Sequence, residues 1–113
     1  MDEDNTILEI PRGDTFKFTV TYIVDEIITS LANYDMRMGI KKNENDTAAL
    51  MQATATITTP SSGVGSFELT PDQTNLPSGN YFYDVRIKNR VTGEKYTIVD
   101  SERCVIKPTI VDI

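Results

Sequence analysis

Histidine and tryptophan are both absent from the 113 residues of the chain. Without histidine, the chain lacks the commonest general base, a frequent metal ligand and the side chain that titrates near neutral pH. The sequence also shows no nucleophile elbow, no phosphate-binding loop and no paired acids beside an expected cleft. We therefore expect no enzymatic activity, no catalytic residues, no cofactor and no metal. Acids at 2–4 and at Glu44 and Asp46 are interpreted as a solvated tail and loop.

Cysteine occurs once, at Cys104, so no internal disulfide can form. The residues around it alternate as in a strand, which predicts a buried and inert thiol. No apolar run approaches the ~20 residues of a membrane span. The acidic start MDEDNT also lacks the basic and apolar regions of a secretory signal. We therefore expect no membrane partner.

Positive charge is scarce, and the net charge is −6. Nucleic-acid binding needs clustered lysine and arginine to neutralise phosphates, so we expect no nucleic-acid partner. Four cations nevertheless gather around one expected hairpin: Arg86, Lys88, Arg90 and Lys95. They fit either a solvated strand face or a surface that meets an anionic partner.

Apolar and polar residues alternate with a period of two along much of the chain, as in half-buried strands. The clearest case is DTFKFTVTY, residues 14–22. Further strands are expected around 7–10, 34–40, 51–58, 67–70, 81–88, 96–98 and 104–106, while 23–33 is interpreted as a loop with one helical turn. The expected core comprises Phe16, Phe18, Val20, Met36, Met38, Tyr81, Tyr83, Val85 and Ile87.

Turn signals separate these strands at the spacing of an antiparallel sandwich or barrel. The pattern predicts an all-β fold of seven to nine short strands in a single domain, residues 1–113. In NLPSGNYFYDV, residues 75–85, Tyr81 is expected to pack its ring in the core and return its hydroxyl to upstream backbone. Gly79 would supply a conformation that a side chain blocks, and Asp84 would be a partly exposed acid near Arg86 or a cross-strand basic residue.

The segments RGDTF, residues 12–16, and LPSGNYFYDVRI, residues 76–87, carry a family resemblance. With the intervening strands, residues 7–108 resemble small immunoglobulin-like domains of tailed bacteriophages. The nearest type is the N-terminal domain of baseplate upper proteins and related tail or head accessory proteins. The resemblance implies an immunoglobulin-like antiparallel β-sandwich and a non-enzymatic structural role in the virion, after synthesis in the cytoplasm of the bacterial host.

Such a role implies tail or baseplate attachment or capsid decoration, through contacts with other virion proteins or with further copies of the chain. A baseplate upper protein continues into a stalk, whereas this sequence stops at Ile113. A free-standing accessory protein, including a decoration protein, is therefore an equal expectation. The alternative is a bacterial surface adhesion or carbohydrate-binding module with an immunoglobulin-like fold.

The segment TIVDI, residues 109–113, is apolar and β-prone. Such a segment is a template for pairing with another chain, so Ile110 and Ile113 are the expected assembly contacts. Ile7 and Leu8 are the second candidates. The alternative is that TIVDI completes the sheet of its own chain. The RGD at residues 12–14 is interpreted as a turn rather than an integrin-binding motif.

Overall fold

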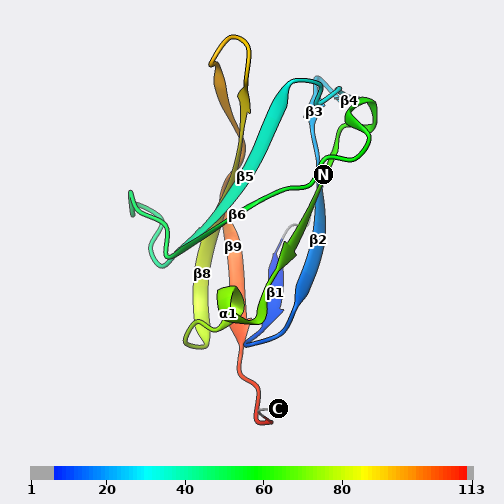
Figure 1. Cartoon of the computed structure of the whole chain (residues 1–113). Coiled ribbons are helices and arrows are strands. Elements are labelled where there is room, and N and C mark those ends of the chain that lie inside the picture. Colours follow the sequence, from blue (N-terminus) through cyan, green and yellow to red (C-terminus); the bar gives the residue numbers. More distant parts are fainter. Residues whose placement is uncertain (1–6, 112–113) are drawn as a thin grey trace.

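The computed structural model describes residues 7–111, and this part of the chain is mostly β-strand (Figure 1). The expected all-β class is confirmed. The strands are β1 (Leu8–Pro11), β2 (Phe16–Thr21), β3 (Ile23–Val24), β4 (Ile27–Ile28), β5 (Tyr34–Lys41), β6 (Met51–Thr54), β7 (Val64–Leu69), β8 (Gly79–Asn89) and β9 (Lys95–Lys107). A 3-10 turn, η1 (Pro60–Ser62), precedes β7, and a short helix, α1 (Pro71–Thr74), follows it.

The largest sheet has five strands in the order β1-β9-β8-β5-β6, while β2 pairs with β7 and β3 pairs with β4. All these pairs are antiparallel except β1 with β9, which run parallel with Leu8 beside Cys104. The expectation of a purely antiparallel arrangement is therefore wrong at this edge. Parallel neighbours need a long connection. Here β1 and β9 are the first and last strands along the chain, so all the other strands form the connection between them.

Two strands are longer than the short strands expected, because β8 has 11 residues and β9 has 13. The segments around Tyr96 and Cys104, expected as separate strands, both belong to β9. A bulge lies between them, where Ser101 has a φ of 51° and the register with β8 shifts beside Val85. The extra residue at a bulge lets one strand continue pairing although its side-chain alternation has slipped.

Residues 23–33 do not contain the expected helical turn; they begin with the hairpin β3–β4. Asp25 and Glu26 form its turn with φ values of 51° and 68°. Positive φ at both central residues is the geometry that matches the twist of paired strands. Isoleucine and valine on either side favour the extended backbone over the helix that their spacing suggested.

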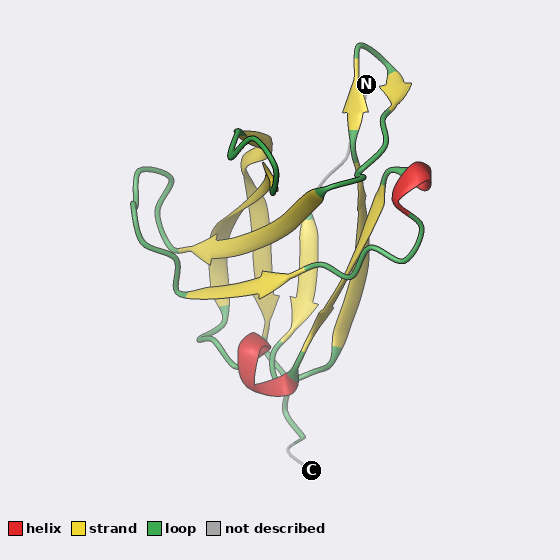
Figure 2. Cartoon of the chain, turned by 45° about the horizontal axis from the view of Figure 1, so that its top comes forward, coloured by secondary structure: helices red, strands yellow, loops and turns green. Residues whose placement is uncertain are grey.

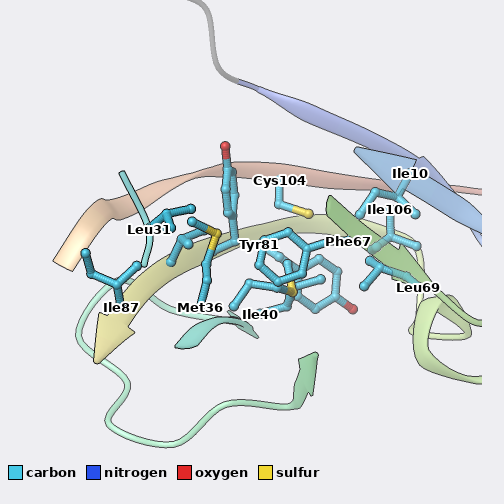
Figure 3. Close-up of a cluster of buried hydrophobic side chains, with 13 residues drawn as sticks. Ile10, Leu31, Met36, Ile40, Phe67, Leu69, Tyr81, Ile87, Cys104 and Ile106 are labelled. Atoms are coloured by element: carbon cyan, nitrogen blue, oxygen red, sulfur yellow. The ribbon is translucent and has the colours of Figure 1, made fainter. Parts of the chain in front are cut away.

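The core lies between the five-stranded sheet and the β2–β7 pair (Figure 3). The buried apolar side chains are Ile10, Leu31, Met36, Met38, Ile40, Phe67, Leu69, Tyr81, Tyr83, Val85, Ile87, Cys104 and Ile106. The expectation that Phe16, Phe18 and Val20 are inside is only partly right, since all three are half-buried against this cluster. β2 pairs with β7 alone within residues 7–111, so its side chains have less cover.

The strand expected over 51–58 also ends early, at Thr54. The chain then leaves the five-stranded sheet, and Thr56 bridges to Ser66 beside the other sheet. The β3–β4 hairpin and the β8–β9 turn project from one end of the molecule, while α1 and the segment after β9 lie at the other (Figures 1 and 2). The molecule measures 43 × 29 × 27 Å along its principal axes.

Candidate assembly surfaces

The corner before β8 is held by the tyrosine that the sequence singled out. The Tyr81 ring is 3% exposed, and its hydroxyl donates a hydrogen bond to the carbonyl oxygen of Pro77. Gly79 has a φ of 149°, a conformation that side chains disfavour. Tyr81 therefore anchors the loop to the core and is not available as a binding residue.

The helix α1 fastens this corner to the rest of the molecule. The Thr70 hydroxyl accepts from the Gln73 amide at 3.2 Å, and the Gln73 side chain accepts from the Thr70 amide at 2.9 Å. This reciprocal pair is a capping box. Buried Thr74 donates to the carbonyl oxygen of Asp14 at 2.7 Å, which ties the RGD segment to the helix. Gly13 has a φ of 80°, so the segment forms a turn.

Asp84 lies at the bulge and is fully engaged there. Its Oδ1 accepts from the Ser101 amide at 2.6 Å, and its Oδ2 lies 3.2 Å from the Lys41 ammonium on β5. These contacts satisfy the backbone where the ladder of β8 and β9 is interrupted. Lys41 is therefore the basic partner expected for this acid, and the pair has a structural role.

The hairpin β3–β4 projects from the body and exposes a cluster of apolar side chains. Ile23, Val24, Ile27 and Ile28 are exposed by 55%, 41%, 67% and 61%. All four are β-branched, and they flank the acidic turn of Asp25 and Glu26. Sequence reasoning missed this surface because it treated the segment as a loop. The run of β-branched residues on both sides of two acids was the signal.

The hairpin is mounted firmly on the body. The Tyr22 amide donates to the Gly63 carbonyl and the Thr29 amide donates to the Tyr22 carbonyl, both at 2.8 Å. A Cβ atom at Gly63 would lie 2.6 Å from the Thr29 oxygen and 2.9 Å from Ile28 Cγ2. The close approach of the two backbones therefore requires glycine at this position, and the projection of the hairpin is fixed by its base.

The terminal assembly contacts proposed from the sequence have different surroundings. Ile7 is 49% exposed, whereas Leu8 is half-buried in β1 and packs against the core. Ile110 is 98% exposed. Ile113 lies outside the described residues. Strand β9 ends at Lys107, so the described part of TIVDI adds no strand to its own sheet; Thr109 donates to the Arg12 carbonyl at 3.1 Å.

Chemically reactive groups are rare in the described part of the chain. Burial raises the pKa of the Cys104 thiol to about 12, so the sulfur stays protonated and unreactive at neutral pH. No three Cys, Asp or Glu side chains among residues 7–111 gather as metal ligands would. In the same span, no helix has the length and apolar character needed to cross a bilayer.

Comparison with protein-family models finds none that matches the chain, and comparison with curated proteins finds no significant match.

Proposed function

We propose that the chain is a non-enzymatic structural or accessory protein of a tailed-phage virion, which attaches to its neighbours through protein–protein contacts. The exposed apolar hairpin β3–β4 is the observation that carries this proposal. A two-stranded hairpin is at best marginally stable alone in water. The four β-branched side chains on this element are exposed in the isolated chain, and a partner that covers them would bury a compact apolar surface.

The hairpin also indicates what kind of partner fits. Its flanks are apolar and its tip carries Asp25 and Glu26, which are both exposed. An apolar groove with basic side chains at its rim would bury the flanks and complement the tip. The partner is therefore another structural protein of the particle with such a groove.

The proposal includes an immunoglobulin-like β-sandwich as the finer description of the fold. It is supported by the Tyr81–Pro77 contact at the corner before β8 and by the packing of β2–β7 against the five-stranded sheet. The placement of the chain in the virion rests on the phage-domain resemblance. The contacts proposed for tail attachment, baseplate attachment or capsid decoration are the hairpin at one end of the molecule and the exposed Ile110 in the segment after β9.

The test is incorporation into particles. A tagged chain produced in the infected host should co-sediment with purified particles of the phage that encodes it, and electron microscopy should locate it on tail, baseplate or capsid. Replacing Ile23, Val24, Ile27 and Ile28 by threonine keeps β-propensity but removes apolar surface. This variant should incorporate about tenfold less, since loss of ~1.4 kcal/mol of apolar contact is sufficient for that change.

Leu50→Thr is the matched control, because Leu50 is 54% exposed in the connection between β5 and β6. It should incorporate as the unmodified chain does. Circular dichroism should show that both variants remain folded. Absence of the unmodified chain from particles would contradict the virion role. Normal incorporation of the threonine variant would contradict the hairpin as the docking element.

A further inference from the structure

The outer face of the five-stranded sheet forms a groove of about 710 Å³, on the side away from the core. The connection between β5 and β6 folds over this face and forms one wall. A Cβ atom at Gly39 would lie 3.1 Å from the Cβ atom of Ala49, so the absence of a side chain at Gly39 lets the connection approach the sheet. The groove is therefore a built feature of the sheet and not an open plane.

Five cations line this groove, and four of them form two neighbouring like-charge pairs. Arg37 on β5 lies directly opposite Arg86 on β8, and Lys88 on β8 lies directly opposite Lys95 on β9. Side chains in such cross-strand positions are about 5 Å apart at Cβ, and like charges there destabilise the sheet. All four side chains are exposed. The sequence pointed to three of them, and the strand register adds Arg37.

The carboxylates in the groove already have other partners. Asp35 lies opposite Lys88 in the register but pairs with Arg90 at 2.7 Å. Asp84 is held by Lys41 and the Ser101 amide, and Asp46 accepts from the Asn43 amide at 3.0 Å. Within residues 7–111, Lys41 is the groove cation with an ion pair, and none of the other four forms one.

This concentration of unpaired positive charge occurs in a chain whose net charge is −6. The cluster of cations is therefore not simply one part of a generally basic protein surface. An anion bound between Arg37 and Arg86 would relieve their repulsion and accept hydrogen bonds from both guanidinium groups. Arginine forks match carboxylates especially well, because two parallel N–H groups meet two oxygens.

The lining of the groove also indicates the class of anion. None of the described residues that line it is aromatic, so it offers no stacking platform for bases or sugar rings. The net negative charge of the molecule opposes any long polyanion, so a short run of carboxylates between the two arginines fits the groove better than a long polyphosphate. We propose that this groove binds an acidic polypeptide segment of a neighbouring protein, with Arg37 and Arg86 as the central contacts. This surface is separate from the β3–β4 hairpin.

The test uses the complete chain and a fluorescently labelled hexaglutamate peptide, with binding followed by fluorescence anisotropy at low ionic strength. The double variant Arg37→Gln/Arg86→Gln removes the central contacts. The matched control is Lys17→Gln/Arg103→Gln, which has the same net charge but changes exposed cations outside the groove. Thermal unfolding verifies that each protein is folded. An oligothymidylate of equal length serves as the competing class of ligand.

We expect the unmodified chain to bind hexaglutamate, and the groove variant to bind about tenfold more weakly or worse, while the control changes affinity by less than about twofold. Failure of the unmodified chain to bind the peptide would overturn the proposal. An equal loss in both variants would also overturn it, because net charge alone would then explain binding. Tighter, arginine-dependent binding of the oligothymidylate would assign the groove to nucleic acid instead. Each outcome is independent of particle incorporation.

Discussion

Tyr81 combines a ring that is 3% exposed with a hydroxyl that donates to the Pro77 carbonyl. Asp84 similarly accepts from the Ser101 amide at the bulge of β9. In both places one side chain satisfies a backbone group at a point where the chain turns or the ladder breaks. A typical intramolecular hydrogen bond contributes about 0.5–1.5 kcal/mol net, so we expect each of these two contacts to stabilise the fold by about that amount.

Tyr81→Phe keeps the buried ring and removes only the hydroxyl donor. We expect the free energy of unfolding, measured with urea, to fall by about 0.5–1.5 kcal/mol because the hydrogen bond to the Pro77 carbonyl is lost. Tyr96→Phe is the control, since Tyr96 is 42% exposed and water can replace any contact of its hydroxyl. Equal effects of the two substitutions would show that the corner hydrogen bond contributes no stability.

Buried ionisable groups predict a loss of stability at alkaline pH. Burial raises the pKa of the Cys104 thiol from 9.0 to about 12, and burial together with Glu102 raises the pKa of the Tyr83 hydroxyl from 10.0 to about 12. The unfolded chain loses these protons first, so deprotonation favours unfolding. Their contribution is complete below about pH 9 and is lost as pH rises toward about 12.

Urea unfolding at a series of pH values checks this expectation. Cys104→Ala lowers stability at every pH by leaving a cavity, but it should also flatten the decline between about pH 9 and 10, where the thiol is the titrating group. An unchanged slope in this variant would contradict the assigned role of Cys104.

At the scale of elements, alternation predicted the inward faces of β5, β7 and β8 correctly, because each strand has one face on the core and one face in water. It failed at β3–β4, where Val24, Ile27 and Ile28 have helical spacing but no core to face. Because these side chains are exposed, their spacing does not reflect a buried helix face, and the helical periodicity was misleading. Alternation also predicted two separate strands where the structure has the single strand β9, because the bulge at Ser101 shifts the alternating pattern.

The turn of β3–β4 places Glu26 at a φ of 68°, where a residue with a Cβ atom is strained by about 1 kcal/mol. Glu26→Gly should remove this strain and raise the free energy of unfolding by about 0.5–1 kcal/mol. Glu44→Gly is the control, because Glu44 has no positive φ and gains only chain entropy in the unfolded state. A loss of stability in both variants would contradict strain at the turn. Denaturant melts of the two proteins provide the measurement.

At the scale of the whole molecule, the sequence located only part of the candidate surfaces. Arg86, Lys88 and Lys95 were recognised as a cluster because they are close in the chain. Arg37 was missed, since only the β5–β8 register brings it opposite Arg86, and Arg90 turned out to pair with Asp35. Ile110 is exposed as expected, whereas Leu8 is half-buried and packs against the core. Long-range pairing, which no local pattern encodes, decided these outcomes.

The repulsion between Arg37 and Arg86 and the negative charge of the whole molecule have opposite effects when Arg86 is replaced. Arg86→Gln makes the net charge of −6 more negative, which by itself should destabilise an acidic protein. It also removes the repulsion with Arg37, which lies directly opposite with Cβ atoms about 5 Å apart, and the Debye length at 0.1 M salt is ~10 Å. The effect of the nearby Arg37 should exceed the effect of net charge. Thermal unfolding of Arg86→Gln without ligand should therefore show a free energy of unfolding that is higher by about 0.2–1 kcal/mol.

Lys17→Gln makes the same change in net charge but removes a cation that lies opposite Glu68. Its stability should therefore decrease slightly, and the two variants should differ in sign. Both effects should shrink in 1 M salt, where the Debye length is about 3 Å. If Arg86→Gln instead destabilises the protein as Lys17→Gln does, the Arg37–Arg86 pair carries no repulsion for a ligand to relieve, and the physical argument for an anion in the groove is lost.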